Sequence, residues 1–348
     1  SSIEHLIRGT EDINWSGEII PYSYSDEMKS VLGDSTILKI YLSPGGGIDS
    51  TKVFREGSGD IVVNSRAPED WQYKYIRDAI SRVNEEFAIT IKEVNLLSEA
   101  HVPIYIVDEP NNYSVNGLWG EKFSDQIHIL MSHHEWNPEH TWTNSVNVQK
   151  SWNKIFLHEL GHLLGLEHPW NKNDGDYAFK GPEFADGLTV KELQDINLPT
   201  VMGFHTQFNG KTMEWYQPLD KQALENVWGK EILKTYEGNS DNYTFFNLGQ
   251  GQYGVRADKT TIIDPLNDFT SINFLNQTLN IKNDIKATFD QVTGLNTDSG
   301  EMFRLYNAAF ARFPDADGLK YWIDEFSSGR NTRRVVAQSF LGSAEFTE

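Results

Sequence analysis

The chain has 348 residues, of which 39% are apolar, 12% aromatic and 23% charged, and its formal net charge is −20. A chain of this size and aromatic content can bury a core in each of two domains, which excludes a disordered protein, and its acidic surplus repels phosphate, which excludes a nucleic-acid partner. It has no cysteine, which excludes disulfides, thiolate metal sites and a thiol nucleophile, and no apolar run that approaches the roughly 18 residues of a membrane span.

The first 131 residues predict a sheet and one helix. Apolar extended runs predict strands at Glu18–Ser25, Ile37–Leu42, Ala88–Val94, Val102–Val107 and Gln126–Met131. Glu69–Phe87 is expected to be a helix, because its apolar side chains recur at three- and four-residue spacing. Asn111–Gly120 is a polar segment, rich in Asn and Gly, that could include a short edge strand of the sheet. This order of elements favours an α/β domain with a partly parallel sheet.

The next hundred or so residues predict two helices separated by a long loop. The first helix is expected over Val148–Leu164. The loop, Glu167–Thr212, is rich in Asn, Asp, Gly and Pro, and a loop this long inside a compact domain is usually functional. The second helix, Pro218–Trp228, stops at a glycine. It is expected to close a first domain that spans residues 1–235.

The last third of the chain changes character twice. Residues 236–298 are polar and Asn-rich, and they predict a short β-rich connecting segment. Residues 299–348 predict an all-α module of three amphipathic helices, at Glu301–Phe313, Asp317–Phe326 and Thr332–Leu341. A core of three short helices is near the lower limit for independent stability, so we expect the module to pack partly against residues 236–292. No internal repeat is visible.

The strongest chemical signal lies at the end of the helix predicted over Val148–Leu164. His158 and His162 are four residues apart, so on a helix they share a face and can bind one ion. Gly165 can adopt a left-handed conformation that turns the chain back, so that His168 becomes a third ligand. Three imidazoles with an open fourth position are typical of a catalytic zinc site, and Glu159 is placed to act as a base. A chance pattern of solvent-facing histidines is the alternative.

The pattern His-Glu-x-x-His-x-x-Gly-x-x-His resembles the signature of the metzincin metalloproteases. These enzymes have a turn with a methionine beneath the metal, and Thr200–Phe204 with Met202 is similar to it. Within the metzincins, residues 1–230 look most like the serralysin-type bacterial endopeptidases. Further segments carry that likeness: Arg8–Thr10, Pro21–Tyr24, Phe87–Val94, His168-Pro169 and Pro218–Gly229. The resemblance implies an α/β catalytic domain with a twisted mixed sheet and a long zinc-binding helix.

The resemblance also implies a function, that of a secreted or cell-surface bacterial zinc endopeptidase. One catalytic Zn²⁺ on His158, His162 and His168 would polarise the scissile carbonyl and activate a water molecule. Glu159 would be the general base, and Met202 would form an apolar floor that orients the imidazoles. A polypeptide substrate would bind a monomeric enzyme as an extended strand along an edge strand, which we expect at Val115–Trp119.

Two departures from the serralysins matter. Serralysins and astacins place a tyrosine two residues after the methionine, where it helps to stabilise the oxyanion, and this chain has Phe204 there. The matrixins work without that tyrosine, so activity is not excluded. The second departure is that the calcium-binding β-roll of serralysins is missing. A proteolytically inert zinc-containing surface or binding protein is therefore the alternative, although Glu159 argues against it, because a decayed site loses its base more readily than its ligands.

Calcium is a second candidate ion. Asn171–Asp176 clusters oxygen donors around a glycine, and Asp174 and Asp176 are its candidate calcium ligands. An ordinary Asx-rich turn is the alternative. Asp258, Asp264 and Asp268 form a weaker candidate set in the connecting segment.

The C-terminal module, Phe303–Phe346, resembles a small helical module of unsettled function found at the C-terminal end of bacterial exported, calcium-repeat and surface-layer proteins. Its shared residues have structural explanations: Pro314-Asp315 begins a helix, Gly318 permits a close approach, and Tyr321 and Trp322 pack the core. We therefore expect a role in export, attachment or partner binding, with no part in hydrolysis. The alternative is that the module supports the protease domain.

Overall fold

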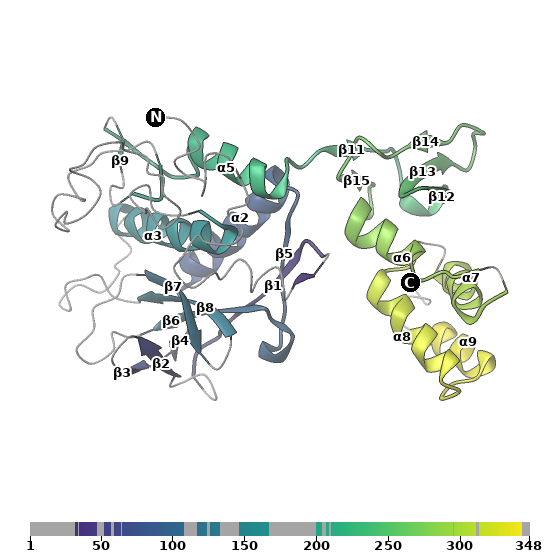
Figure 1. The fold of residues 1–348 in the computed structure, drawn as a ribbon, viewed down its shortest axis with the longest axis horizontal. Coiled ribbons are helices and arrows are strands. Elements are labelled where there is room, and N and C mark those ends of the chain that lie inside the picture. The colour runs from purple at the N-terminus through teal and green to yellow at the C-terminus, as the bar shows by residue number, and fades with distance from the viewer. Residues whose placement is uncertain are drawn as a thin grey trace. The chain divides into compact units, whose positions relative to one another are not determined.

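The computed structural model describes residues 32–33, 35–46, 52–56, 59–63, 65–107, 117–123, 126–132, 146–166, 200–203, 207–208, 210–294, 296–310 and 313–342. The chain divides into two compact units, Ser1–Lys230 and Glu231–Glu348, which are coloured from purple to green and from green to yellow in Figure 1. Each unit has a hydrophobic core of its own. The strand expected at Glu18–Ser25 lies outside the described residues.

A six-stranded mixed sheet is the base of the first unit. Its strands are β1 (Ile37–Leu42), β4 (Ser65–Arg66), β5 (Thr90–Glu93), β6 (Val102–Val107), β7 (Gly117–Phe123) and β8 (Gln126–Ser132). They run in the order β5-β1-β6-β8-β7, with β4 also on β6. The pairs β1–β5, β1–β6 and β6–β8 are parallel, and β7 and β4 are antiparallel to their neighbours. Every residue of β6 is buried, as expected for a central strand covered on both faces.

Two helices, α2 (Asp70–Glu86) and α3 (Val146–Leu164), lie side by side on one side of this sheet (Figure 1). A reciprocal capping box of Glu69 and Gln72 starts α2. Edge-on aromatic contacts join the helices: Trp71 of α2 lies 5.2 Å from Trp152 of α3 between ring centroids. Both helices predicted from apolar spacing are confirmed, with ends that differ by one or two residues.

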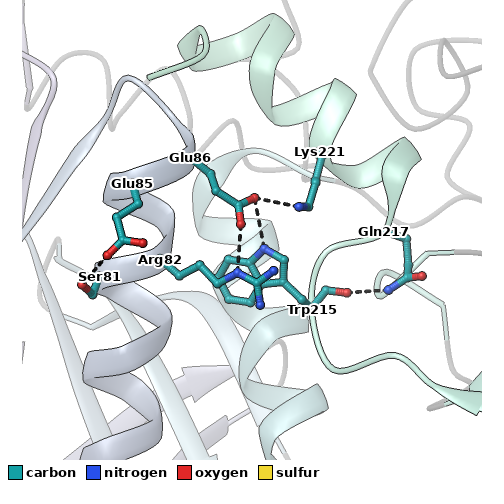
Figure 2. A network of polar contacts seen from close by, with 7 residues as sticks. All are labelled: Ser81, Arg82, Glu85, Glu86, Trp215, Gln217 and Lys221. Atoms are coloured by element: carbon teal, nitrogen blue, oxygen red, sulfur yellow. Dashed lines mark hydrogen bonds and ion pairs between the residues drawn. The ribbon is translucent and has the colours of Figure 1, made fainter. Parts of the chain in front are cut away.

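The helix α5 (Pro218–Trp228) has the predicted bounds. Proline occupies its first turn, and the helix stops at Gly229, whose φ is +83°. Figure 2 shows how the carboxylate of Glu86, at the end of α2, connects α2 to this region. Glu86 accepts hydrogen bonds from Arg82 Nε (2.8 Å), Lys221 Nζ (2.9 Å) and Trp215 Nε1 (3.2 Å). The Arg82 guanidinium also lies 4.3 Å from the centroid of the Trp215 ring.

Smaller elements complete the first unit. They are the antiparallel hairpin of β2 (Lys52–Glu56) and β3 (Gly59–Val63), the 3₁₀ turn η4 (Leu97–Glu99), and the pair β9 (Gln207–Phe208) and β10 (Lys211–Thr212). The β2 strand lies close to β7. The sequence did not predict the hairpin.

The second unit begins with two three-stranded sheets. One contains β11 (Leu233–Thr235), β15 (Ser271–Asn273) and β16 (Thr278–Asn280), and the other β12 (Tyr243–Gly249), β13 (Gln252–Ala257) and β14 (Asp264–Pro265), with the 3₁₀ turn η6 (Ser240–Asn242). The helical part consists of the π-helix η7 (Ile281–Lys286), α6 (Ala287–Phe289), α7 (Asp298–Phe310), α8 (Ala316–Ser327) and α9 (Arg333–Leu341). The three predicted amphipathic helices are confirmed as α7, α8 and α9.

Residues 299–348 pack against residues 236–292, as predicted. Thr288 Oγ1 donates a hydrogen bond to the carbonyl of Pro314 (3.0 Å), and Gln291 Nε2 donates to that of Ala316 (2.9 Å). The ring of Phe313 lies 4.7 Å from that of Phe245 and belongs to the same core as the sheets. The two segments therefore form one compact unit.

The start of α8 explains, in physical terms, two of the positions on which the resemblance of the module rests. Asp315 caps the helix by accepting from Gly318 N (2.6 Å), and its other oxygen accepts from Tyr306 Oη (2.6 Å). A Cβ at Gly318 would lie 2.7 Å from this carboxylate, so the expected close approach is confirmed. The core position predicted for Tyr321 is wrong: its side chain is 55% exposed, because α8 turns it away from the cluster that holds Trp322.

Two further observations concern partners and ions. Among the helices in the described ranges, none combines the length and the apolar composition needed to cross a bilayer.

Asp258, Asp264 and Asp268 do not gather into a cluster that could hold an ion; Asp264 instead accepts hydrogen bonds from Lys234 and from Tyr236 Oη. In this arrangement one oxygen of the Asp264 carboxylate is engaged by the ammonium group of Lys234 and the hydroxyl of Tyr236.

Candidate metal site

The helix α3 brings the side chains of His158 and His162 together. Their Nε2 atoms are 3.1 Å apart, and the two rings meet nearly at right angles, with centroids 4.7 Å apart. Four-residue spacing on one helical face produces this arrangement.

The other nitrogen of each ring is fixed by a backbone carbonyl. His158 Nδ1 lies 2.9 Å from the carbonyl oxygen of Val201, and His162 Nδ1 lies 2.7 Å from that of Leu166. A carbonyl oxygen can only accept, so each Nδ1 carries the proton and each Nε2 presents a lone pair. Two such lone pairs facing each other at 3.1 Å repel unless a metal ion or a proton lies between them.

The geometry fits zinc. Zinc–nitrogen bonds of about 2.0–2.1 Å at a tetrahedral angle place two ligand nitrogens about 3.3 Å apart, close to the observed separation. Burial lowers the pKa of His162 to about 4, an effect that the nearby charge of Lys154 reinforces and the hydrogen bond to Leu166 opposes. The ring is therefore neutral near pH 7, the form that binds a metal ion.

The end of α3 turns the chain sharply. Gly165 has a φ of +109°, in the left-handed range expected for it. Its N–H donates a hydrogen bond to the carbonyl of His162 (2.9 Å), and the N–H of Leu166 donates one to the carbonyl of Gly161 (2.8 Å). This pair of hydrogen bonds is typical of a Schellman cap. His168 lies outside the described residues, and within them no three His, Asp or Glu side chains gather.

Met202 lies against α3 at a glycine. Its side chain is fully buried, and a Cβ on Gly161 would lie 2.7 Å from Met202 Sδ. Only a residue without a side chain permits this approach. Gly161 directly precedes His162, so the thioether lies beneath the part of the helix that carries the two imidazoles.

The turn Thr200–Gly203, which carries Met202, is held by α5. The carboxylate of Asp220 accepts from Thr200 Oγ1 and from the N–H groups of Val201 (3.1 Å) and Gln217 (2.8 Å). Burial raises the pKa of Asp220 to about 6, although these hydrogen bonds and the charge of Lys154 act in the opposite direction. The first turn of α5 is thereby joined to the methionine turn.

The same turn is held by α3 through Lys154. The ammonium group of Lys154 donates to the carbonyl of Gly203, and only 5% of the residue is exposed. Burial lowers the pKa of Lys154 to about 8, while the charges of Glu159 and Asp220 act to raise it. Glu159 is itself 7% exposed and directly follows His158.

The sequence did not predict a role for Gly161, Lys154 or Asp220 in this site. Lys154 carried a signal: it lies four residues before His158, so it shares the face of the two imidazoles, where a lysine has no access to bulk water. Asp220 is the third residue of a helix, an ordinary capping position. No local pattern distinguishes Gly161 from other helical glycines.

Other expected site residues are only partly described. The strand β7 is one of the two strands that end the order of the described sheet, and it lies next to α3. It includes residues 117–119 of the expected strand Val115–Trp119. Phe204, Asp174 and Asp176 lie outside the described residues, as does His168.

Comparison with known families concerns the second unit alone. A family model described as a domain of unknown function (DUF4214) matches residues 287–348, the stretch that contains α6 to α9. No curated protein matches the chain. The family match covers less than a fifth of the chain and does not extend into the first unit.

Proposed function

We propose that the first unit is a metzincin-like zinc endopeptidase that hydrolyses peptide bonds outside a bacterial cell or at its surface. The observation that carries this proposal is the pair of Nε2 atoms 3.1 Å apart on α3, with each Nδ1 fixed by a backbone carbonyl. When both rings are neutral, this arrangement directs two lone pairs at one point, as two imidazole ligands of a single metal ion do.

His158, His162 and His168 would hold the ion. A bound zinc would supply a Lewis acid for the scissile carbonyl and would lower the pKa of a water molecule to near neutrality. Glu159 takes a proton from the attacking water and delivers it to the leaving amine. Val201 and Leu166 orient the imidazoles through their carbonyls, and Met202 excludes water beneath them.

A polypeptide substrate would add to the sheet at β7. The strand β7 ends the strand order of the described sheet and lies next to α3. An extended peptide that pairs there gains main-chain hydrogen bonds whatever its sequence, and pockets for its side chains add selectivity. This mode of binding requires only one copy of the chain.

Proteolysis is tested directly with the purified full-length chain and its Glu159→Ala variant. With casein and a peptide library as substrates, we expect cleavage by the zinc-loaded wild type, loss of cleavage in a chelator, and recovery when zinc is returned. Removal of a general base typically costs 10²–10⁴-fold in rate, so Glu159→Ala is expected to bind zinc and to cleave at least about 100-fold more slowly. Zinc-loaded wild type that cleaves nothing over a wide pH range would contradict the proposal.

Phe204 favours one alternative, a zinc-containing surface or binding protein without proteolytic activity, because phenylalanine has no oxygen for an oxyanion. Zinc binding without cleavage in the same assay identifies this alternative.

Calcium at Asp174 and Asp176 remains a separate proposal. It predicts a higher melting temperature in excess calcium than in a calcium chelator, with zinc kept saturating; an unchanged melting temperature would remove it.

We also propose that the second unit is an accessory for export, attachment or partner binding. Its three short helices and two small sheets have hydrophobic cores of their own. The candidate metal ligands and Glu159 all belong to the first unit.

A further inference from the structure

Lys154 is a buried cation that the proposed reaction does not use. Its ammonium group is taken from water at a desolvation cost, and among the described residues the acceptor it contacts is the carbonyl of Gly203. A lysine is kept in such a place when its charge has a fixed counterpart or its hydrogen bond holds something in position.

Both conditions are met at the turn Thr200–Gly203. Lys154 holds the turn from α3 at its last residue, and Asp220 holds it from α5 at its first two residues. The two charges are opposite, and each shifts the pKa of the other toward the ionised form. A four-residue turn is thus clamped between a buried cation and a buried anion.

The clamp acts on a metal-site residue through Val201. The N–H of Val201 donates to Asp220, and the carbonyl of Val201 accepts from His158 Nδ1 at 2.9 Å. A shift of the turn would move this carbonyl, and the imidazole of His158 would rotate with it. The N–H of Met202, the next residue, donates to Thr200 Oγ1 (3.0 Å), so the turn moves as one piece.

We propose that Lys154 is a positioning residue of the metal site: together with Asp220 it clamps the turn Thr200–Gly203 and thereby fixes the direction of the His158 imidazole. This inference rests on the proposed function, because it requires that His158 and His162 bind a metal ion. Lys154 is outside the His-Glu-x-x-His-x-x-Gly-x-x-His pattern and is not one of the expected metal ligands.

The test is a cobalt(II) titration of the purified full-length chain, in which visible absorption reports the geometry of the ligands. Loss of a partner that orients a ligand typically weakens metal binding 10–100-fold, so Lys154→Met is expected to bind cobalt at least about 10-fold more weakly, with altered bands. Lys154→Gln retains a donor for the Gly203 carbonyl and is expected to recover most of the affinity. Lys150→Met is the matched control, because Lys150 lies one turn earlier on α3 in an exposed ion pair with Glu214.

Three outcomes decide the question. Wild type that binds cobalt while Lys154→Met binds within threefold of it, or more tightly, with unchanged bands, overturns the inference and leaves the proposed zinc site intact. Wild type that does not bind cobalt overturns both. If Lys154→Met does not fold, ¹⁵N-lysine NMR of the wild type replaces it: the ammonium signal that disappears in Lys154→Gln is expected to shift on addition of zinc, and a signal that does not move overturns the inference.

Discussion

At the scale of single residues, the space beside Gly161 decides how the methionine turn meets α3. The site of a Cβ on Gly161 is 2.7 Å from Met202 Sδ and 3.5 Å from Leu166 Cδ1, and Met202 and Leu166 are both fully buried. A side chain at this position therefore has to displace the thioether.

We predict that Gly161→Ala destabilises the chain although alanine favours helices. Alanine gains about 1 kcal/mol over glycine in a helix, while overpacking a buried site costs roughly 1–3 kcal/mol, so the net loss is expected to be about 1 kcal/mol in urea unfolding. Met202→Ala removes the clash and leaves space for the new methyl group. The double variant should therefore lose less than the sum of the two single losses; simple additivity would contradict the contact.

A second residue-scale prediction concerns Asp220, whose burial raises its pKa from 3.8 to about 6. Between these values the folded chain holds a proton that the unfolded chain has released, so this group makes stability fall as pH rises from about 4 to about 6. Asp220→Asn removes the titration. With both proteins in excess chelator, the stability of wild type relative to Asp220→Asn is expected to fall by roughly 1–3 kcal/mol across this window, and a constant difference would show that Asp220 titrates normally.

At the scale of elements, the sequence was most informative where periodicity is strong. The bounds of β1, β6 and α5 match those predicted. The alternating pattern of β1 and the uniformly apolar run of β6 mark where these strands begin and end. The helix α5 has proline at its start and glycine at its end, and these residues mark its limits. The role of Lys154 depends on a carbonyl 49 residues later in the chain. Local spacing contains no information about such a partner.

One ion pair, between Glu86 of α2 and Lys221 of α5, connects these two helices (Figure 2). Burial alone would raise the pKa of Glu86, but hydrogen bonds from Lys221, Arg82 and Trp215 outweigh it and lower the pKa below 4.5. The carboxylate therefore stabilises the fold above pH 4.5, and this contribution is lost as pH falls through the lower folded-state value.

Glu86→Gln is expected to lower the stability at pH 7 by about 0.5–1 kcal/mol, the range of well-formed but partly exposed ion pairs. The difference from wild type should shrink as the solution is acidified. Glu85→Gln is the matched control, because the neighbouring Glu85 accepts only a 3.4 Å hydrogen bond from Ser81 among the described residues. An effect of equal size in the two variants would show that the connection to α5 contributes nothing.

At the scale of the whole molecule, the sequence predicted a change of character near residue 236, and the structure divides the chain after Lys230. The β-rich segment and the helices that follow were expected to contact each other, but their union in one unit depends on a shared aromatic cluster. Phe313 follows α7 in the chain and yet packs with Phe245 and Phe289. Which aromatic side chains meet across such a distance is set by tertiary packing, which amphipathic spacing does not encode.

Deletion of Glu231–Glu348 tests whether the second unit is an accessory. The core of the first unit is formed within residues 32–224, and α5 ends at Trp228, before the cut. We therefore expect the shortened chain to keep its melting temperature to within about 2 °C, together with its cobalt affinity and any peptide cleavage. Residues 231–348 expressed alone should show a cooperative unfolding transition, because their two aromatic clusters share Phe303. A shortened chain that aggregates or no longer binds cobalt would instead make the second unit a part of the fold of the first.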